Sequence, residues 1–191
     1  MELVSEAVVF AVKAHDGMRR KNSDAPYILH PMEAAVIVGT MTADQNVIAA
    51  AALHDVVEDA GVTIEEVEEK FGKRVRDLVA SETEDKRADL PPAATWRIRK
   101  EETLAILRDT DDMDVLRVWL GDKLANMRAI HQNHKAEGDA MWQRFNQKDP
   151  REHAWYYGRI VELTERLSDT SAWLEYKALT ELVFGKGESN P

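Results

Sequence analysis

The chain has 191 residues, a net charge of −10 and no cysteine. This length allows one large domain or two small ones, and a composition of 44% hydrophobic and 31% charged residues is typical of a folded globular protein rather than a disordered chain. The acidic charge argues against a nucleic-acid binder, and the lack of cysteine excludes disulfides and thiolate metal sites. Without a long apolar run or a signal-peptide pattern, we expect a cytoplasmic protein with no membrane partner.

Apolar residues recur at helical spacing along the chain, and no alternating run of β-branched residues predicts a strand. A proline after His30 and a capping box from Thr63 to Glu66 mark two helix starts, and Gly72 interrupts the pattern. We therefore predict an all-α fold, a single domain over residues 1–191. The expected helices span 3–14, 33–41, 46–59, 64–70, 73–81, 95–108, 112–131, 151–168 and 170–184.

Two polar loops separate these helices. Residues 16–29 carry three consecutive cations, and residues 82–94 end in a proline pair that cannot continue a helix. Such basic residues are usually solvated, but they would also suit a phosphorylated ligand. We interpret the second loop as a mobile flap rather than an interdomain linker.

The predicted helix 46–59 is apolar nearly all round, except for His54, Asp55, Glu58 and Asp59 near its end. A helix of this kind belongs in a core, where polar groups need partners. At helical spacing Glu58 and Asp59 lie one turn after Asp55, so three carboxylates crowd together. A bound cation would relieve their repulsion.

Further metal-ligand candidates are His15, His30 and Asp122, the last inside an apolar helical segment. A buried histidine is more often an ordinary core residue, and we give His15 that interpretation. Asp122 beside Lys123 could equally be a solvated pair. Together, however, two imidazoles and two carboxylates form a nitrogen and oxygen site suited to Mn²⁺, Fe²⁺ or Zn²⁺, with Mn²⁺ preferred.

An ordered set of motifs resembles the RelA/SpoT-type HD hydrolases. The resemblance runs from about residue 4 to 135, with a further aromatic match in the C-terminal helices at about 151–184. It is carried by residues 11–21 (AVKAHDGMRRK), 26–35 (PYILHPMEAA), 50–63 (AAALHDVVEDAGVT), 71–75 (FGKRV), 83–86 (TEDK), 121–128 (GDKLANMR) and 155–157 (WYY). This ordered set is far more specific than a histidine followed by an aspartate.

The resemblance implies a single HD-domain helical bundle that hydrolyses the 3′-pyrophosphate of the nucleotides ppGpp and pppGpp with Mn²⁺. It also implies roles for particular residues. The metal ligands would be His30, His54, Asp55 and Asp122, and the pair that activates water would be Glu58 and Asp59. The expected substrate contacts are Arg19, Arg20, Lys21, Lys86, Asn126 and Tyr156.

Some features depart from the pattern of these hydrolases. The chain looks too short for further synthetase and regulatory domains, so we expect a small stand-alone hydrolase. Residues 86–101 are unusual, and Gly121 replaces a more usual alanine. These differences leave two alternatives open: the same chemistry on another phosphorylated nucleotide or cofactor, or a module that binds a nucleotide without hydrolysing it. The acidic, helical surface permits a homodimer but does not require one.

Overall fold

The computed structural model describes residues 1–20, 24–87 and 89–185. In these ranges the regular structure is helical, apart from one isolated β-bridge between Arg19 and Pro26, which confirms the predicted all-α fold. No helix in the described ranges is long and apolar enough to cross a membrane.

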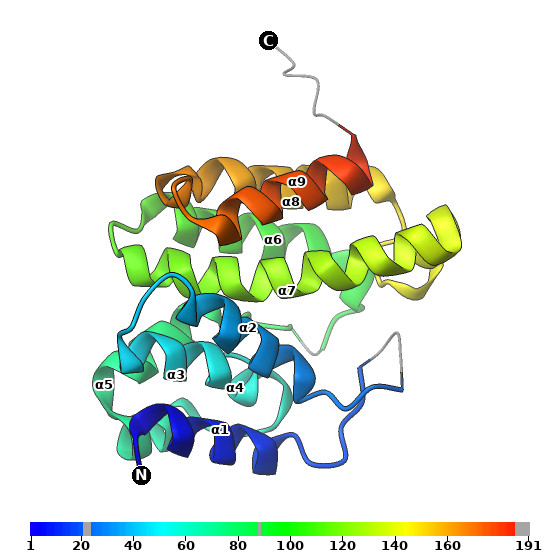
Figure 1. The fold of residues 1–191 in the computed structure, drawn as a ribbon. Helices are drawn as coiled ribbons and strands as arrows, with labels where there is room; N and C mark the ends of the chain where they lie inside the picture. The colour runs from blue at the N-terminus through cyan, green and yellow to red at the C-terminus, as the bar shows by residue number, and fades with distance from the viewer. Residues whose placement is uncertain (21–23, 88, 186–191) are drawn as a thin grey trace.

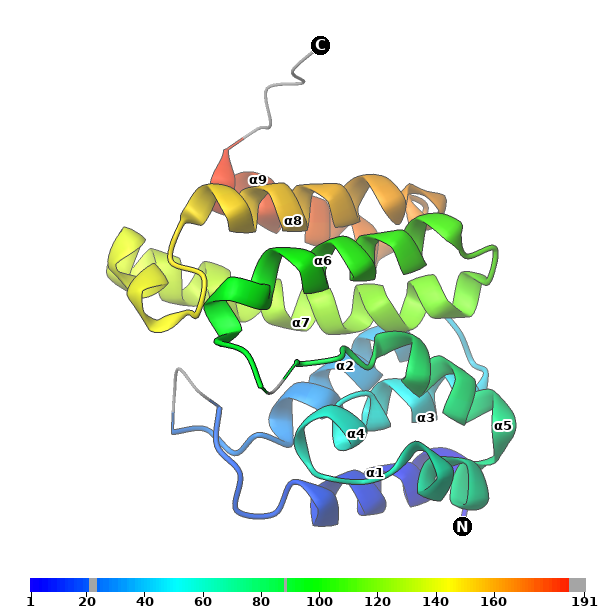
Figure 2. The ribbon, with the colours of Figure 1, turned by 180° about the vertical axis from the view of Figure 1, so that it is seen from behind.

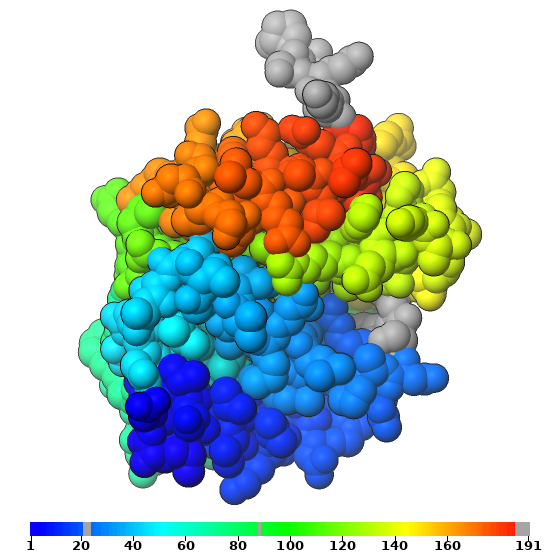
Figure 3. Space-filling model, in the orientation of Figure 1, coloured from blue at the N-terminus to red at the C-terminus, as the bar shows by residue number. Residues whose placement is uncertain are grey.

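The helices form two adjoining groups with α7 between them (Figures 1 and 2). The first group holds α1 (Leu3–Ala14), α2 (Leu29–Gly39), α3 (Gln45–Leu53), α4 (Val56–Asp59) and α5 (Ile64–Glu82). The second holds α6 (Pro92–Asp109), α8 (Pro150–Leu163) and α9 (Ser171–Phe184). Helix α7 (Met113–Glu137) packs on α2, α3 and α5 on one side and on α9 on the other. In the space-filling view the two groups meet in one continuous surface (Figure 3).

Helix α3 forms the centre of the first group. Its four consecutive alanines, residues 49–52, are fully buried, and the helix packs on α1, α2, α5 and α7. Small side chains let neighbouring backbones approach closely, so α3 can be surrounded on all sides. The segment with His54 and Asp55 follows directly at the end of this buried helix.

The prediction of one helix over 46–59 is wrong. Helix α3 ends at Leu53, and α4 begins at Val56 after Asp55 adopts φ −94° and ψ −4°, away from regular α-helix. The Ala51 carbonyl, which would accept from the amide of Asp55 in a continuous helix, lies 2.8 Å from Nδ1 of the His54 ring. The side chains of His54 and Asp55 therefore point in other directions than they would on a continuous helix.

Several boundary signals agree with the structure. The capping box is formed: the Thr63 amide donates to the Glu66 carboxylate at 2.7 Å, and the Glu66 amide donates to the Thr63 hydroxyl at 3.2 Å. Gly72 has φ +84° inside α5, so the two predicted helices meet at a kink there. Helix α2 starts at Leu29, earlier than predicted. Two 3₁₀ helices, η1 (Gly138–Arg144) and η2 (Glu165–Leu167), were not expected from the pattern.

Candidate metal centre and adjoining cavity

Four side chains from three parts of the fold come close together. His30 lies in the first turn of α2, His54 and Asp55 occupy the break between α3 and α4, and Asp122 lies in α7. His30, His54 and Asp122 are each at most 6% exposed. The structure therefore brings together the four residues that the sequence suggested as metal ligands.

The facing atoms are close to one another. The two Nε2 atoms of His30 and His54 are 3.3 Å apart. Oδ2 of Asp55 lies 3.1 Å from His54 Nε2 and 3.5 Å from His30 Nε2. Oδ1 of Asp122 lies 2.9 Å from His30 Nε2 and 3.6 Å from His54 Nε2. Ligands bonded at about 2.0–2.2 Å to one ion stand about 3.0–3.6 Å apart, so these spacings fit a single small divalent cation.

The protonation of His54 also fits a metal ligand. Its Nδ1 faces the Ala51 carbonyl, which can only accept, so Nδ1 carries a hydrogen and Nε2 points into the cluster. Burial alone would lower the pKa of His54, but the carboxylates of Asp55 and Asp122 raise it well above its ordinary value. The cluster thus demands positive charge at the point where the four atoms meet, which a proton or a metal ion can supply.

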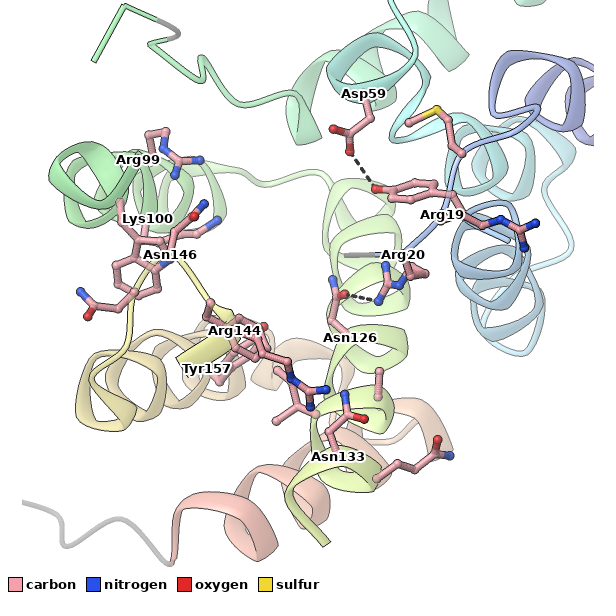
Figure 4. A pocket seen from close by; sticks show the side chains of 18 residues that line it. Arg19, Arg20, Asp59, Arg99, Lys100, Asn126, Asn133, Arg144, Asn146 and Tyr157 are labelled. Carbon is pink, nitrogen blue, oxygen red and sulfur yellow. Dashed lines mark hydrogen bonds between the residues drawn. The ribbon is translucent and has the colours of Figure 1, made fainter. Parts of the chain in front are cut away.

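Asp122 is also held by two neighbours on its own helix. Its Oδ2 pairs with the Lys123 ammonium, and its Oδ1 accepts from the Asn126 amide at 2.6 Å. Arg20 in turn donates to the Asn126 side-chain oxygen at 3.2 Å (Figure 4). A short chain of hydrogen bonds therefore joins the first polar loop to the buried cluster.

The Glu58–Asp59 pair lies beside the cluster, partly exposed. Asp59 accepts from the Tyr27 hydroxyl at 2.7 Å and from the Lys86 ammonium at 2.5 Å. Lys86 also donates to the Glu58 backbone oxygen at 2.9 Å. Burial and the nearby Asp55 raise the pKa of the Glu58 carboxyl, so Glu58 holds a proton more tightly than an ordinary glutamate.

A cavity of about 500 Å³ opens next to this cluster. It reaches the cluster through Tyr27 and Asn126, which bond Asp55 and Asp122 respectively. On α7 it extends to Asn133, about 16 Å of helix from Asp122. Of the described residues that line it, five are cationic and come from three parts of the chain: Arg19, Arg20, Arg99, Lys100 and Arg144 (Figure 4).

Three of the six residues predicted to contact substrate line this cavity, namely Arg19, Arg20 and Asn126. Lys21 lies outside the described residues. The ammonium of Lys86 is engaged by Glu58 and Asp59 rather than facing the cavity.

The structure places Tyr157, and not the predicted Tyr156, in the cavity wall. The Tyr156 side chain is 2% exposed and its hydroxyl has no hydrogen-bond partner among the residues that the structure describes, whereas Tyr157 lines the cavity. Of these two tyrosines, Tyr157 therefore lines the cavity and Tyr156 does not.

Several lining residues were not selected from the sequence. Arg99 and Lys100 on α6 had a visible signal, a basic cluster in residues 96–100. Arg144 and Asn146 follow α7 in a stretch without periodicity, so no sequence signal pointed to them. Tyr27 stands in the resemblance motif next to His30 but was given no role.

The two departures from the expected pattern lie in different surroundings. The stretch 86–101 supplies Trp96, Arg99 and Lys100 to the cavity, so it does bear on what binds there. Gly121 instead faces α2, where an added Cβ would lie 2.6 Å from Val38 Cγ2. This glycine therefore serves the packing of α7 on α2.

The arrangement of a histidine-aspartate pair, a further histidine and a distant aspartate in a helical bundle defines the HD class of metal-site folds. The family model described as "HD domain" matches residues 7–148, and the chain belongs to this family.

Curated relatives are similar over part of their length. A GTP pyrophosphokinase rsh of Brucella ovis is 36% identical over 128 residues, which are 67% of this chain and 17% of that protein. A GTP pyrophosphokinase of Myxococcus xanthus is 32% identical over 139 residues, 72% of this chain and 18% of that protein. The chain thus spans less than a fifth of the length of these relatives.

Two solved structures share the fold over most of the chain. One is described as a metazoan ortholog of SpoT that hydrolyzes ppGpp and plays a role in starvation responses. It has a TM-score of 0.76 at 24% identity and covers 97% of this chain and 98% of its own. The other, a Listeria monocytogenes EGD-e protein, has a TM-score of 0.71 at 29% identity and covers 82% of this chain and 99% of its own.

Proposed function

We propose that this protein is a metal-dependent phosphohydrolase that removes the 3′-pyrophosphate of ppGpp or pppGpp, yielding GDP or GTP and pyrophosphate. The observation that carries the proposal is a cluster of converging histidine and aspartate ligands opening into a cavity lined by five cations. The relatives with GTP pyrophosphokinase names and the fold shared with a ppGpp hydrolase support the substrate.

In this proposal His30, His54, Asp55 and Asp122 hold one divalent ion, and Mn²⁺ suits their nitrogen and oxygen donors. When bound, such an ion polarises a phosphoryl oxygen and lowers the pKa of water, which supplies a nucleophile at neutral pH. Nitrogen and oxygen donors without a thiolate also suit Fe²⁺ and Zn²⁺. Metal analysis of the purified protein would distinguish these ions from Mn²⁺.

The remaining steps belong to the side chains around the cluster. Glu58, with its raised pKa, accepts the proton of the attacking water, and Asp59 orients that water. Arg20 and Arg19 face the cavity and offset the negative charge that develops on the departing pyrophosphate. Asn126 lies between Asp122 and Arg20, at the place where the nucleotide sugar would pass.

The test is pyrophosphate release from ppGpp by protein purified with Mn²⁺. Asp55→Ala should abolish metal binding and release together. Glu58→Ala should keep the metal and lose about 10²- to 10⁴-fold in turnover, the usual contribution of a general base. A metal-loaded Glu58→Ala variant with near-normal turnover would remove Glu58 from the mechanism.

A second candidate keeps the chemistry and changes the substrate. The unusual stretch 86–101 places Trp96, Arg99 and Lys100 in the cavity wall, and Glu84 pairs with Arg99 at 2.9 Å and Lys100 at 2.6 Å. This pairing reduces the free positive charge there, which would suit a ligand other than ppGpp. A panel of phosphorylated nucleotides and cofactors, with phosphate and pyrophosphate measured separately, would identify it. Tight ppGpp binding without any product would indicate a non-catalytic module.

A further inference from the structure

Tyr27 occupies a position between the two halves of the proposed site. It lies in the loop before α2, where its amide donates to the Met18 carbonyl at 2.9 Å. Its hydroxyl is 2.8 Å from Oδ2 of Asp55 and 2.7 Å from Oδ2 of Asp59. The first of these oxygens faces both histidines of the cluster, and the second belongs to the pair that would handle water.

The ring of Tyr27 is fixed on three sides. It stacks on the His15 ring at 5.1 Å between centroids and 16° between planes. It meets the His30 ring edge-on at 6.1 Å. The Arg20 guanidinium lies 5.8 Å from its centroid, over the face of the ring. A side chain held in this way can place its hydroxyl accurately, whereas a freely rotating one could not.

The hydroxyl has one proton to offer to two carboxylates. A tyrosine hydroxyl has an ordinary pKa of about 10, so the phenol keeps this proton near neutral pH. When the charge of Asp55 is balanced by a cation in the cluster, the Asp59 carboxylate becomes the stronger acceptor for this proton. The hydrogen bond then fixes one oxygen of Asp59, while Lys86 holds the other.

We propose that Tyr27 is a positioning residue of this site: its hydroxyl bridges Asp55 and Asp59 and holds the Asp59 carboxylate at a set place beside the metal ligands. The inference rests on the proposed function, because Asp59 matters for turnover only if it orients the attacking water. Tyr27 itself touches neither the water nor the phosphate in this account.

The first test is kinetic and uses Tyr27→Phe, which keeps the ring stack and removes only the hydroxyl. We expect the rate constant for pyrophosphate release to fall about 10- to 100-fold, while KM and the Mn²⁺ affinity change by less than about twofold. The matched control is Tyr176→Phe, which also loses a hydrogen-bonded hydroxyl but lies in α9, bonded to the Tyr157 carbonyl at 3.1 Å. Its turnover should stay at the wild-type value.

A double-mutant cycle separates positioning from an independent effect. In an Asp59→Ala background, adding Tyr27→Phe should cause no further loss, because the hydroxyl acts through Asp59. Multiplied losses in the double variant, or a Tyr27→Phe enzyme as fast as wild type, would overturn the proposal.

The second test needs no substrate. Crystal structures of the Mn²⁺-loaded wild type and Tyr27→Phe should show the Asp59 carboxylate at the Tyr27 hydroxyl in the first and rotated away in the second. An unmoved Asp59 in the variant would refute the positioning role. If wild-type protein releases nothing from ppGpp while Asp59 moves as expected, the substrate assignment fails and the positioning role stands.

Discussion

At the scale of single residues, the site depends on oxygens that serve several partners. Oδ2 of Asp55 faces both histidine rings and also accepts from Tyr27. Oδ1 of Asp122 faces His30 and accepts from Asn126. Because each shared oxygen is fixed by more than one neighbour, the atoms proposed as metal ligands are held in place by the protein itself. Such preorganisation is what a metal site on rigid elements requires.

Glu82, in contrast, has a carboxyl group that lacks hydrogen-bond partners among the described residues. It is the last residue of α5, it is 5% exposed, and neither carboxylate oxygen has a hydrogen-bond partner in the described part of the chain. Burial raises the pKa of Glu82 to about 8, although the nearby Lys123 acts to lower it. The folded state therefore keeps Glu82 protonated at pH values where the unfolded chain has released the proton.

This predicts a pH-dependent loss of stability. Because the native state binds the Glu82 proton more tightly than the unfolded state, its contribution to the free energy of unfolding falls as pH rises from about 4.5 to about 8. Glu82→Gln removes this titration. In urea unfolding of chelator-treated protein, the free energy of unfolding of the variant relative to wild type should increase with rising pH, by at most about 1.4 kcal/mol per pH unit. A constant difference between the two proteins from pH 5 to 8.5 would contradict the prediction.

At the scale of elements, α7 uses adjacent positions for the candidate site and for packing on α2. Asp122, Asn126 and Asn133 recur at helical spacing and face the cluster and the cavity. Gly121 faces α2, where an added Cβ would lie 3.0 Å from the Ala34 carbonyl oxygen and closer still to Val38. The close approach of α2 to α7 brings His30 to within 2.9 Å of Asp122.

Gly121→Ala should therefore destabilise the protein. The new methyl group must push against a fully buried Val38 and the backbone of α2, an overpacking that costs about 1–3 kcal/mol and outweighs the better helix propensity of alanine. Gly158→Ala in α8 is the matched control, since a Cβ there meets nothing within 4 Å. Thermal unfolding should show a lower Tm for Gly121→Ala and an unchanged or higher Tm for Gly158→Ala. Equal shifts in both would refute the packing argument.

The sequence predicted those elements whose signals are local. The capping box at Thr63 and the interruption at Gly72 depend on a few neighbouring residues, and both are found in the structure. The break after Leu53 could not be predicted, because alanine and leucine continue the helical pattern and nothing in the sequence shows that the His54 ring, rather than a backbone amide, faces the Ala51 carbonyl. Likewise the metal candidates could be chosen from their motifs, whereas Arg144 reaches the cavity only because η1 folds back beside α7.

At the scale of the whole molecule, the proposed metal ligands link segments that are far apart in the chain. His30 belongs to α2, His54 and Asp55 follow α3, and Asp122 belongs to the central α7 (Figure 1). An ion held by all four would fasten these elements together in the folded state. The unfolded chain offers no such arrangement, so metal binding must add to the free energy of unfolding.

Mn²⁺ should therefore raise the Tm of chelator-treated protein. At a concentration of 100 times Kd the gain is about 2.7 kcal/mol, which corresponds to a rise of about 5–10 °C for a chain of this size. Asp122→Asn should abolish the rise, because it weakens one ligand and disturbs the contact with His30. Asp114→Asn is the control, because Asp114 lies on the same helix but pairs with Arg74. The Tm of this variant without metal should fall, while the rise in Tm on adding Mn²⁺ should equal that of the wild type. An equal increment in both variants would mean that the stabilising ion binds elsewhere, and the assignment of Asp122 as a ligand would fail.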